Sequence, residues 1–308
     1  MAGLVVGLIW LSALVVPIVI AWKDRTSIAL ALVIGLLLSF IVQFLAGRYF
    51  VNVWWEMVLI PAFAFESEHL HRLISSGFLH ADVMHVIGNI MVIGLAGIPL
   101  EQRLGRERWI IIYLVGLLGG SIGWSLINSD SYVPTLGASG AAFGLLGAYL
   151  ACWPKDEIPF PLIIIRPWPV SLIALAYFGM ELWRAHAVAS ITGSSGVAHM
   201  AHLTGFIATY SVARLVARGG PFEPGVQDGG PSWSYQPTVI EQITEDPWQE
   251  PSPRLAHLLK KLSEEGDEVI TRQAWLEEIA TEAKCPKCDG ELHLEGLSLV
   301  CKGHLRWP

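Results

Sequence analysis

Two polar residues with complementary chemistry lie inside strongly apolar stretches of this sequence. Ser139 occurs in GASGA at the start of one stretch, and His202 occurs in AHLTG within a later one. A serine hydroxyl is a weak nucleophile until a neighbouring base accepts its proton, and imidazole is such a base. Polar side chains are costly at membrane depth and usually have a function there. The pair therefore predicts a nucleophile and a base within the membrane, although a lone serine of this kind is more often a packing or N-cap residue.

Small residues indicate how these two segments come together. After the serine, Gly140, Gly144 and Ala148 repeat every four residues, which places them on one helix face. Such a stripe allows another helix to approach closely. Gly205 shares a helix face with His202, so its docking against the stripe would bring the imidazole to the serine.

The spacing alone leaves open which of two histidines is the base. His199 precedes His202 by one helical turn, so both lie on similar sides of the helix. The last apolar segment, 197–217, contains no acidic residue, and we therefore expect a Ser/His pair without a carboxylate. Glu181 belongs to the preceding apolar segment, where we expect a polar contact near the outer surface.

A second polar cluster, in HADVMHVIGN, supplies hydrogen-bond donors. His85 and Asn89 are four residues apart and share a helix face, and His80 lies just before this helix. Imidazole and carboxamide groups can stabilise the oxyanion of acyl transfer, but in membrane bundles they also serve as polar contacts between helices. The loop that contains Gly137 places Ser139 in a first helical turn, where unpaired backbone N–H groups favour negative charge.

The composition is that of a multi-pass membrane protein. Hydrophobic residues make up 53% of the chain and charged residues 15%, and the net charge of −7 reflects acidic residues concentrated near the C-terminus. A membrane-spanning helix needs about 20 apolar residues. The first apolar stretch lacks a basic n-region and an AxA-like cleavage site, so we expect a retained anchor there. The sequence predicts an all-α protein with seven spans, at 3–22, 27–46, 84–101, 108–127, 138–153, 168–186 and 197–217.

Basic residues predict the orientation of these spans, because they favour cytoplasmic loops. Every second loop is basic, beginning with Lys23 and Arg25 after the first span. We therefore expect an integral protein of the cell membrane with its N-terminus outside and its C-terminus in the cytoplasm. Residues 47–83 then form a long outer loop, in which Trp54 and Trp55 predict a partly immersed segment, and one more short span remains an alternative there.

The composition changes abruptly after the last span. Residues 219–254 are rich in Gly and Pro, which is typical of a linker. Residues 255–283 have the polar, amphipathic pattern of soluble helices that dock onto a neighbouring fold. The remaining segment, 284–308, contains CPKC and CKGH, two motifs with the spacing of a small zinc ribbon.

We expect this tail to hold one structural zinc ion. The predicted ligands are Cys285, Cys288, Cys301 and His304, and His293 is the weaker alternative to His304. Because the C-terminal region 219–308 as a whole is acidic, a cytoplasmic protein partner is a better expectation than nucleic acid.

Several motifs in one order show that the chain resembles the rhomboid family of intramembrane serine proteases. These motifs are FLHADVMHVIGN, LEQRLGRERWIIIYLVGLLGGSIGW, GASGAAFGLLGAYLA and AHMAHLTGF, and the resemblance covers about residues 50–217. It implies Ser139 as the nucleophile and His202 as the base, because the family histidine is followed by a glycine three residues on. It also implies that His85 and Asn89 stabilise the oxyanion.

The resemblance implies further supporting residues and a fold. His80 would be structural, His199 would support the base, and Glu101 would be a structural acid near Arg103 and Arg106. The glycines of the matching motifs are Gly137, Gly140 and Gly205. The implied fold is a six-helix rhomboid-like core at 27–218, preceded by one extra transmembrane helix at 1–26. One departure lies in the first loop, where the family has a Trp-Arg pair. The nearest match in this chain is His71-Arg72.

The implied activity is cleavage of transmembrane segments by a Ser/His dyad through an acyl-enzyme, without a cofactor for catalysis. Substrates would be transmembrane proteins that enter laterally from the lipid bilayer, past the span at 168–186. An alternative from another class is a noncatalytic rhomboid-like protein that binds transmembrane helices and recruits partners through its zinc tail. A transporter fits less well, because the polar groups gather near one side of the membrane.

Overall fold

The computed structural model describes residues 2–161, 165–187, 198–225, 247–248, 251–265, 269–295, 298–301 and 305–307. Two compact units make up the chain, Met1–Ser234 and Tyr235–Pro308. The boundary between these units falls within the predicted linker, of which residues 226–246 and 249–250 lie outside the described part of the chain.

The first unit is a helical bundle, and each of the seven predicted spans is helical. Its helices are α1 (Ala2–Lys23), α2 (Ile28–Ala46), α3 (Val51–Met57), α4 (Arg72–Ser75), α5 (Val83–Val92), α6 (Ile98–Leu104), α7 (Arg106–Ile127), α8 (Ser139–Cys152), α9 (Val170–Ala187) and α10 (His199–Ala217). Within the described residues, four segments are long and apolar enough to cross a membrane, namely Gly3–Lys23, Ile28–Ala46, Val83–Leu104 and Arg106–Ile127. The prediction of an all-α integral membrane protein is therefore confirmed, whereas membrane crossing by α8, α9 and α10 stays a prediction.

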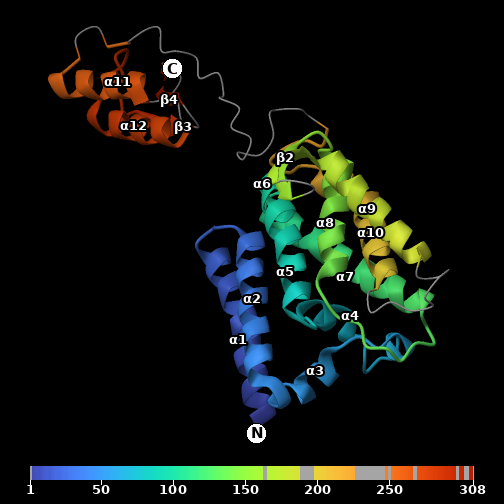
Figure 1. Cartoon of the computed structure of the whole chain (residues 1–308). Coiled ribbons are helices and arrows are strands. Elements are labelled where there is room, and N and C mark those ends of the chain that lie inside the picture. The colour runs from blue at the N-terminus through green and yellow to red at the C-terminus, as the bar shows by residue number, and fades with distance from the viewer. Residues whose placement is uncertain are drawn as a thin grey trace. The chain divides into compact units, whose positions relative to one another are not determined.

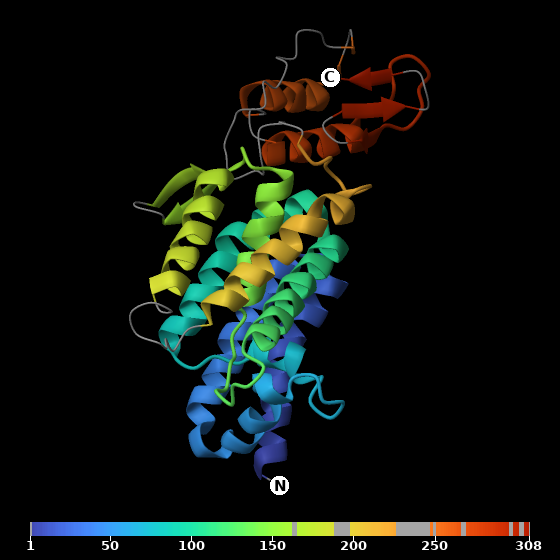
Figure 2. The same ribbon diagram turned by 90° about the vertical axis from the view of Figure 1, so that its right-hand side faces the viewer.

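Helix α8 forms the centre of this bundle. It is apolar all round, and nearly every side chain from Gly140 to Cys152 is buried, as expected for a helix enclosed by others. Helices α7 and α10 pack along it, and Figures 1 and 2 show the three running through the same part of the unit. Helices α1 and α2 lie side by side on one flank, where Leu4, Leu8 and Trp22 of α1 are exposed. An apolar exterior of this kind suits contact with lipid.

The third predicted span is helical but not regular. Helix α5 continues through a π-helical turn at Ile93–Gly97 into α6. Pro99 occupies the first turn of α6. A proline lacks the N–H group that a helix needs, and its ring clashes with the carbonyl of the preceding turn, so the helix widens locally. The apolar run predicted the span but not this turn.

Glu101 of α6 holds the start of α2. Its carboxylate accepts hydrogen bonds from the Ser27 hydroxyl at 2.6 Å and from the N–H groups of Ile28 and Ala29 at 2.8 and 2.9 Å. The first N–H groups of a helix have no intrahelical partner, and the helix dipole favours an anion beside them. The acid is therefore structural, and its hydrogen-bond partners are the first residues of a neighbouring helix.

A buried ion pair holds the loop after α8. Arg103 donates two hydrogen bonds of 2.8 Å to the two carboxylate oxygens of Asp156, and the Tyr149 hydroxyl donates to the same carboxylate at 3.1 Å. The chain then forms an antiparallel hairpin of β1 (Glu157–Pro161) and β2 (Ile165–Pro169). The sequence does not predict this hairpin, because a segment this rich in proline has little strand signal.

Segment 47–83 contains several short helices, and it contacts the loop before α8. Leu59 and Thr135 exchange backbone hydrogen bonds of 3.1 and 2.8 Å, and the Gly137 N–H donates to the Ser76 carbonyl at 3.0 Å. The loop that leads into α8 is thus fixed at two points by residues far away in the sequence.

The second unit packs two helices on a small antiparallel sheet. Its elements are α11 (Pro253–Glu265), α12 (Val269–Glu282), β3 (His293–Glu295), β4 (Ser298–Cys301) and β5 (Leu305–Trp307), with sheet order β3-β4-β5. Leu258 and Leu262 of α11, Leu276 of α12, and Leu299 and Trp307 of the sheet share one buried core. Helix α11 packs against α12, and α12 packs against β3 and β4, so the apolar faces of both helices are buried in this core.

Candidate active site

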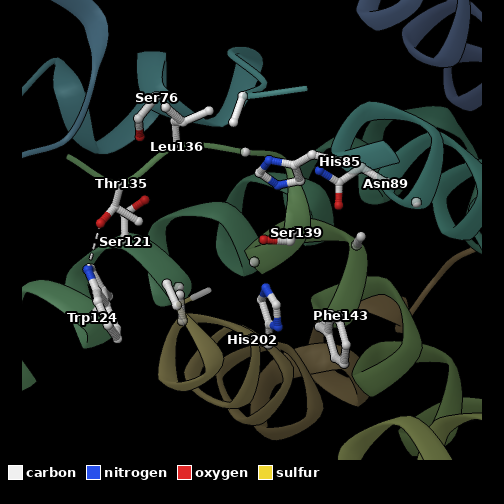
Figure 3. Close-up of a pocket in the computed structure, with 18 of the residues that line it drawn as sticks. Ser76, His85, Asn89, Ser121, Trp124, Thr135, Leu136, Ser139, Phe143 and His202 are labelled. Atoms are coloured by element: carbon white, nitrogen blue, oxygen red, sulfur yellow. Dashed lines mark hydrogen bonds between the residues drawn. The ribbon is translucent and has the colours of Figure 1, made fainter. Parts of the chain in front are cut away.

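Ser139 and His202 meet at one end of the bundle, although they are distant in the sequence. Ser139 is the first residue of α8, and His202 lies near the start of α10. Both line a cavity of about 550 Å³, and Figure 3 shows the imidazole turned toward the serine hydroxyl. The serine is half-buried, and His202 is buried. An imidazole thus lies beside a serine hydroxyl that remains partly accessible.

Close helix packing sets the depth at which His202 lies. A Cβ added to Gly205 would collide with the carbonyl oxygens of Gly140 and Gly116, so α10 touches the backbones of α8 and α7. Gly120 of α7 extends this contact, because an added Cβ would come within 3.0 Å of the Gly140 Cα. The glycine contact between α8 and α10 is as predicted, whereas the participation of α7 was not foreseen.

The loop before α8 directs the serine toward the cavity. Gly137 has a φ of +122°, which favours glycine because it has no Cβ. A Cβ at this position would also collide with the ring of His85. Gly137 therefore lets the chain turn sharply beside this imidazole and enter the helix at Ser139.

Two contacts fix the ring of His202. Its face lies on the ring of Phe143, with centroids 4.5 Å apart and an interplanar angle of 4°. Its Nδ1 donates a hydrogen bond of 2.8 Å to Glu181 Oε2. Because Nδ1 is bound to a carboxylate, Nε2 is the nitrogen of this ring that has a free lone pair. Phe143 follows Ser139 by one turn of α8, so the helix that begins at the serine also orients the imidazole.

A carboxylate accompanies the Ser/His pair, and the prediction of a pair without one is therefore wrong. Glu181 of α9 is 2% exposed, and its Oε2 accepts hydrogen bonds from Nδ1 of both His202 and His199, at 2.8 and 2.7 Å. Its Oε1 accepts from Arg184 at 3.3 Å. An acidic residue in an apolar helix was the available signal, but the spacing within one helix does not reveal partners on another.

His85 and Asn89 project from α5 into the same cavity as Ser139 (Figure 3). The Asn89 amide donates one hydrogen bond of 2.9 Å to Nε2 of His80, and a carboxamide has a second N–H to offer. His80 is fully buried and so holds Asn89 in place. As the first residue of α8, Ser139 adds a backbone N–H without an intrahelical partner. These groups are the kinds of donor that stabilise an oxyanion.

A separate cysteine cluster in the second unit has the chemistry of a metal site. The sulfur atoms of Cys285, Cys288 and Cys301 lie within 4.8 Å of one another, and those of Cys288 and Cys301 are 3.2 Å apart. Three thiolates suit a soft metal such as zinc. The predicted fourth ligand, His304, lies outside the described residues, and the alternative His293 lies in β3.

Known proteins share the membrane part of this chain. Residues 67–219 match the family model described as the Rhomboid domain. "Rhomboid-related protein 2" of Mus musculus is 32% identical over 152 residues, which is 48% of this chain and 49% of that protein. "RHOMBOID-like protein 12, mitochondrial" of Arabidopsis thaliana is 27% identical over 168 residues, which is 49% of this chain and 48% of that protein. "Rhomboid-related protein 3" of Homo sapiens is 27% identical over 202 residues, which is 64% of this chain and 47% of that protein.

The fold and the site together define a helical membrane protein with a serine and a histidine in one cavity. With the domain match, the chain belongs to the rhomboid family. It spans about half the length of the curated relatives it matches.

Proposed function

We propose that this chain is an intramembrane serine endopeptidase that cleaves transmembrane segments of membrane proteins. The observation that carries the proposal is the meeting of Ser139 and His202 in one cavity. The donors of His85 and Asn89 in the same cavity support it, because acyl transfer needs an oxyanion site as well as a nucleophile and a base. Membership of the rhomboid family supports the same assignment.

In this mechanism, Ser139 Oγ attacks the scissile carbonyl carbon while His202 Nε2 accepts the hydroxyl proton. His85, Asn89 and the Ser139 backbone N–H stabilise the tetrahedral oxyanion. Collapse of the intermediate breaks the C–N bond, and His202 returns the proton to the leaving amine, which leaves an acyl group on Ser139. Water then attacks this acyl group with His202 as base, so that the carboxylic acid product leaves and the serine is regenerated.

A transmembrane substrate must unwind locally before it reacts, because the carbonyl groups of a helix are already hydrogen bonded. We therefore expect small or helix-breaking residues near the cleaved bond. Helix α9 contributes Tyr177 and Met180 to the cavity lining, so a segment that enters past α9 arrives beside Ser139.

The proposed orientation places the N-terminus outside the cell and the C-terminus in the cytoplasm. It follows from basic residues that alternate between loops, such as Lys23 and Arg25 after α1. The start of α8 then lies toward the outer side of the membrane, and cleavage occurs near the outer leaflet.

A cleavage assay with purified protein in liposomes tests the proposed function. With a fluorescent transmembrane substrate, Ser139→Ala and His202→Ala should each lower the initial rate by at least about 1,000-fold. Ser211→Ala on the exposed side of α10 and His257→Ala on exposed α11 are matched controls that should retain wild-type rates. Cleavage that persists in either site variant would reject the assignment.

We also propose that the C-terminal segment holds one structural zinc ion through Cys285, Cys288, Cys301 and His304. The close approach of the three cysteine sulfur atoms supports this site. The zinc would stabilise the fold of residues 284–308 and take no part in peptide hydrolysis. Because the region 219–308 as a whole is acidic, we expect its partner to be a cytoplasmic protein.

A further inference from the structure

Three hydrogen-bond donors converge on the carboxylate of Glu181. Oε2 accepts from Nδ1 of His202 at 2.8 Å and from Nδ1 of His199 at 2.7 Å, and Oε1 accepts from Arg184 at 3.3 Å. The carboxylate is almost fully buried, and it lies on a different helix from the two histidines. A buried carboxylate is costly unless it is paired in this way, so its retention calls for an explanation.

We infer that Glu181 is a positioning residue for His202, so that Ser139 faces an imidazole whose far nitrogen is hydrogen bonded to a carboxylate. The inference rests on the proposed function and adds a third member to its catalytic pair. Glu181 itself lines the cavity beside Ser139 and His202. Its role is exerted on the histidine rather than on the substrate.

The chemistry of a carboxylate explains this role. An ionised carboxylate only accepts hydrogen bonds, so it holds the proton of His202 on Nδ1 and leaves the lone pair of Nε2 free for the serine. When Nε2 takes the Ser139 proton, the imidazole becomes positively charged, and the fixed negative charge of Glu181 stabilises it. The Nδ1 proton stays on His202 throughout, and Glu181 remains ionised.

His199 and Arg184 hold the carboxylate in place. Among the described residues, the cavity lining includes His202 but not His199, and His199 contacts the site through its hydrogen bond to Glu181 and the edge of its ring. Its ring is perpendicular to that of His202, with centroids 6.3 Å apart. Arg184 binds the other oxygen, so the carboxylate cannot rotate without losing a partner. The arrangement also favours His202 over His199 as the base. Of these two histidines, only His202 both lines the cavity and binds the carboxylate.

A purely structural role, as a polar bridge between α9 and α10, makes a different prediction. Loss of a bridge would lower thermal stability and would affect substrate binding and turnover alike. Loss of a positioning residue lowers kcat and the reactivity of Ser139, while KM and the melting temperature change little. The two roles can therefore be separated by measuring all four quantities.

The test compares Glu181→Gln with Glu107→Gln, which removes the same charge at an exposed position on α7. The measurements are kcat, KM, melting temperature, and the rate at which a fluorophosphonate probe labels Ser139. We expect Glu181→Gln to lower kcat and the labelling rate by about 100-fold or more, with KM within threefold of the control. Glu181→Asp, which keeps the charge but shortens the side chain, should retain more activity than Glu181→Gln.

Rates for Glu181→Gln within twofold of Glu107→Gln would overturn the inference. If Glu181→Gln does not fold, Glu181→Asp decides: a kcat at least tenfold lower with unchanged KM supports positioning, and a wild-type kcat overturns it. Failure of the wild-type protein to cleave the reporter or to be labelled at Ser139 would overturn the proposed function, and the positioning role with it. Wild-type activity combined with an active Glu181→Gln would overturn the inference alone.

Discussion

His202 lies flat against Phe143, with ring centroids 4.5 Å apart and planes only 4° apart. Phe143 belongs to α8, the same helix that begins at Ser139. The imidazole of His202 on α10 is therefore oriented by the helix that begins at Ser139. Any movement of one helix relative to the other changes the alignment of both groups at once.

Replacement of Phe143 should therefore impair catalysis more than folding. We expect Phe143→Leu to lower kcat about tenfold, because loss of the flat ring frees the imidazole to tilt away from the serine. Steady-state cleavage kinetics in liposomes measure this effect. Phe44→Leu on α2, whose side chain is 69% exposed, is the matched control and should leave kcat unchanged. Equal kcat values for the two variants would show that the stacked ring does not align the base.

The glycine contact between α8 and α10 predicts a loss of stability on substitution. In Gly205→Ala the added methyl group meets backbone carbonyl oxygens that cannot move independently of their helices. We expect the free energy of unfolding to fall by about 1–3 kcal/mol, the usual effect of overpacking. Equilibrium unfolding in detergent micelles measures it.

Gly179→Ala provides the control for this substitution. Gly179 lies in α9, and an added Cβ would meet nothing within 4 Å. The control should be as stable as the wild type or slightly more stable, because alanine favours a helix over glycine. Equal unfolding free energies for the two variants would contradict the close contact of α8 and α10.

Much of the membrane unit was predictable because its signals are local. Runs of apolar residues predicted each of the long helices, and the glycine at position 205 predicted which face of α10 docks. The π-helical turn before Pro99 was not predicted, because a hydrophobic pattern does not report where a helix widens. The hairpin of β1 and β2 was missed because its prolines conceal the strand pattern.

The candidate site was likewise predictable where its signals are local, and it was not predictable where contacts between helices decide. Ser139 and His202 were recognisable as polar residues in apolar helices, and the structure brings both into one cavity. Glu181 carried the same kind of signal but was assigned to the outer surface, because its partners lie on α10. Phe143 gave no signal, since an aromatic residue in a buried helix is ordinarily part of the core. Contacts between helices thus decided the roles that spacing within one helix left open.

The proposed zinc site in the tail predicts that loss of the metal affects the structure of the tail but not peptide hydrolysis. Elemental analysis of the purified full chain should find about one zinc per chain in the wild type and none in Cys301→Ser. Cys152→Ala, which alters a cysteine in the core of the membrane unit, should keep the metal.

Chelation gives the second readout for this site. Removal of zinc should make the segment after residue 283 sensitive to added protease, because the metal supplies much of the stability of a small ribbon. Cleavage of a transmembrane reporter should remain within twofold of the untreated rate. Wild-type protein without bound zinc would refute the metal site, and loss of cleavage on chelation would refute its separation from catalysis.

The most direct test of the central claim is to map the adduct that a fluorophosphonate probe forms with the purified, folded protein. Only a serine with an aligned base reacts readily with such a probe. Peptide mapping by mass spectrometry should place the adduct on Ser139, and His202→Ala should abolish it while the melting temperature stays near that of the wild type. Absence of an adduct on Ser139, or labelling that is equally strong without the imidazole of His202, would contradict the account.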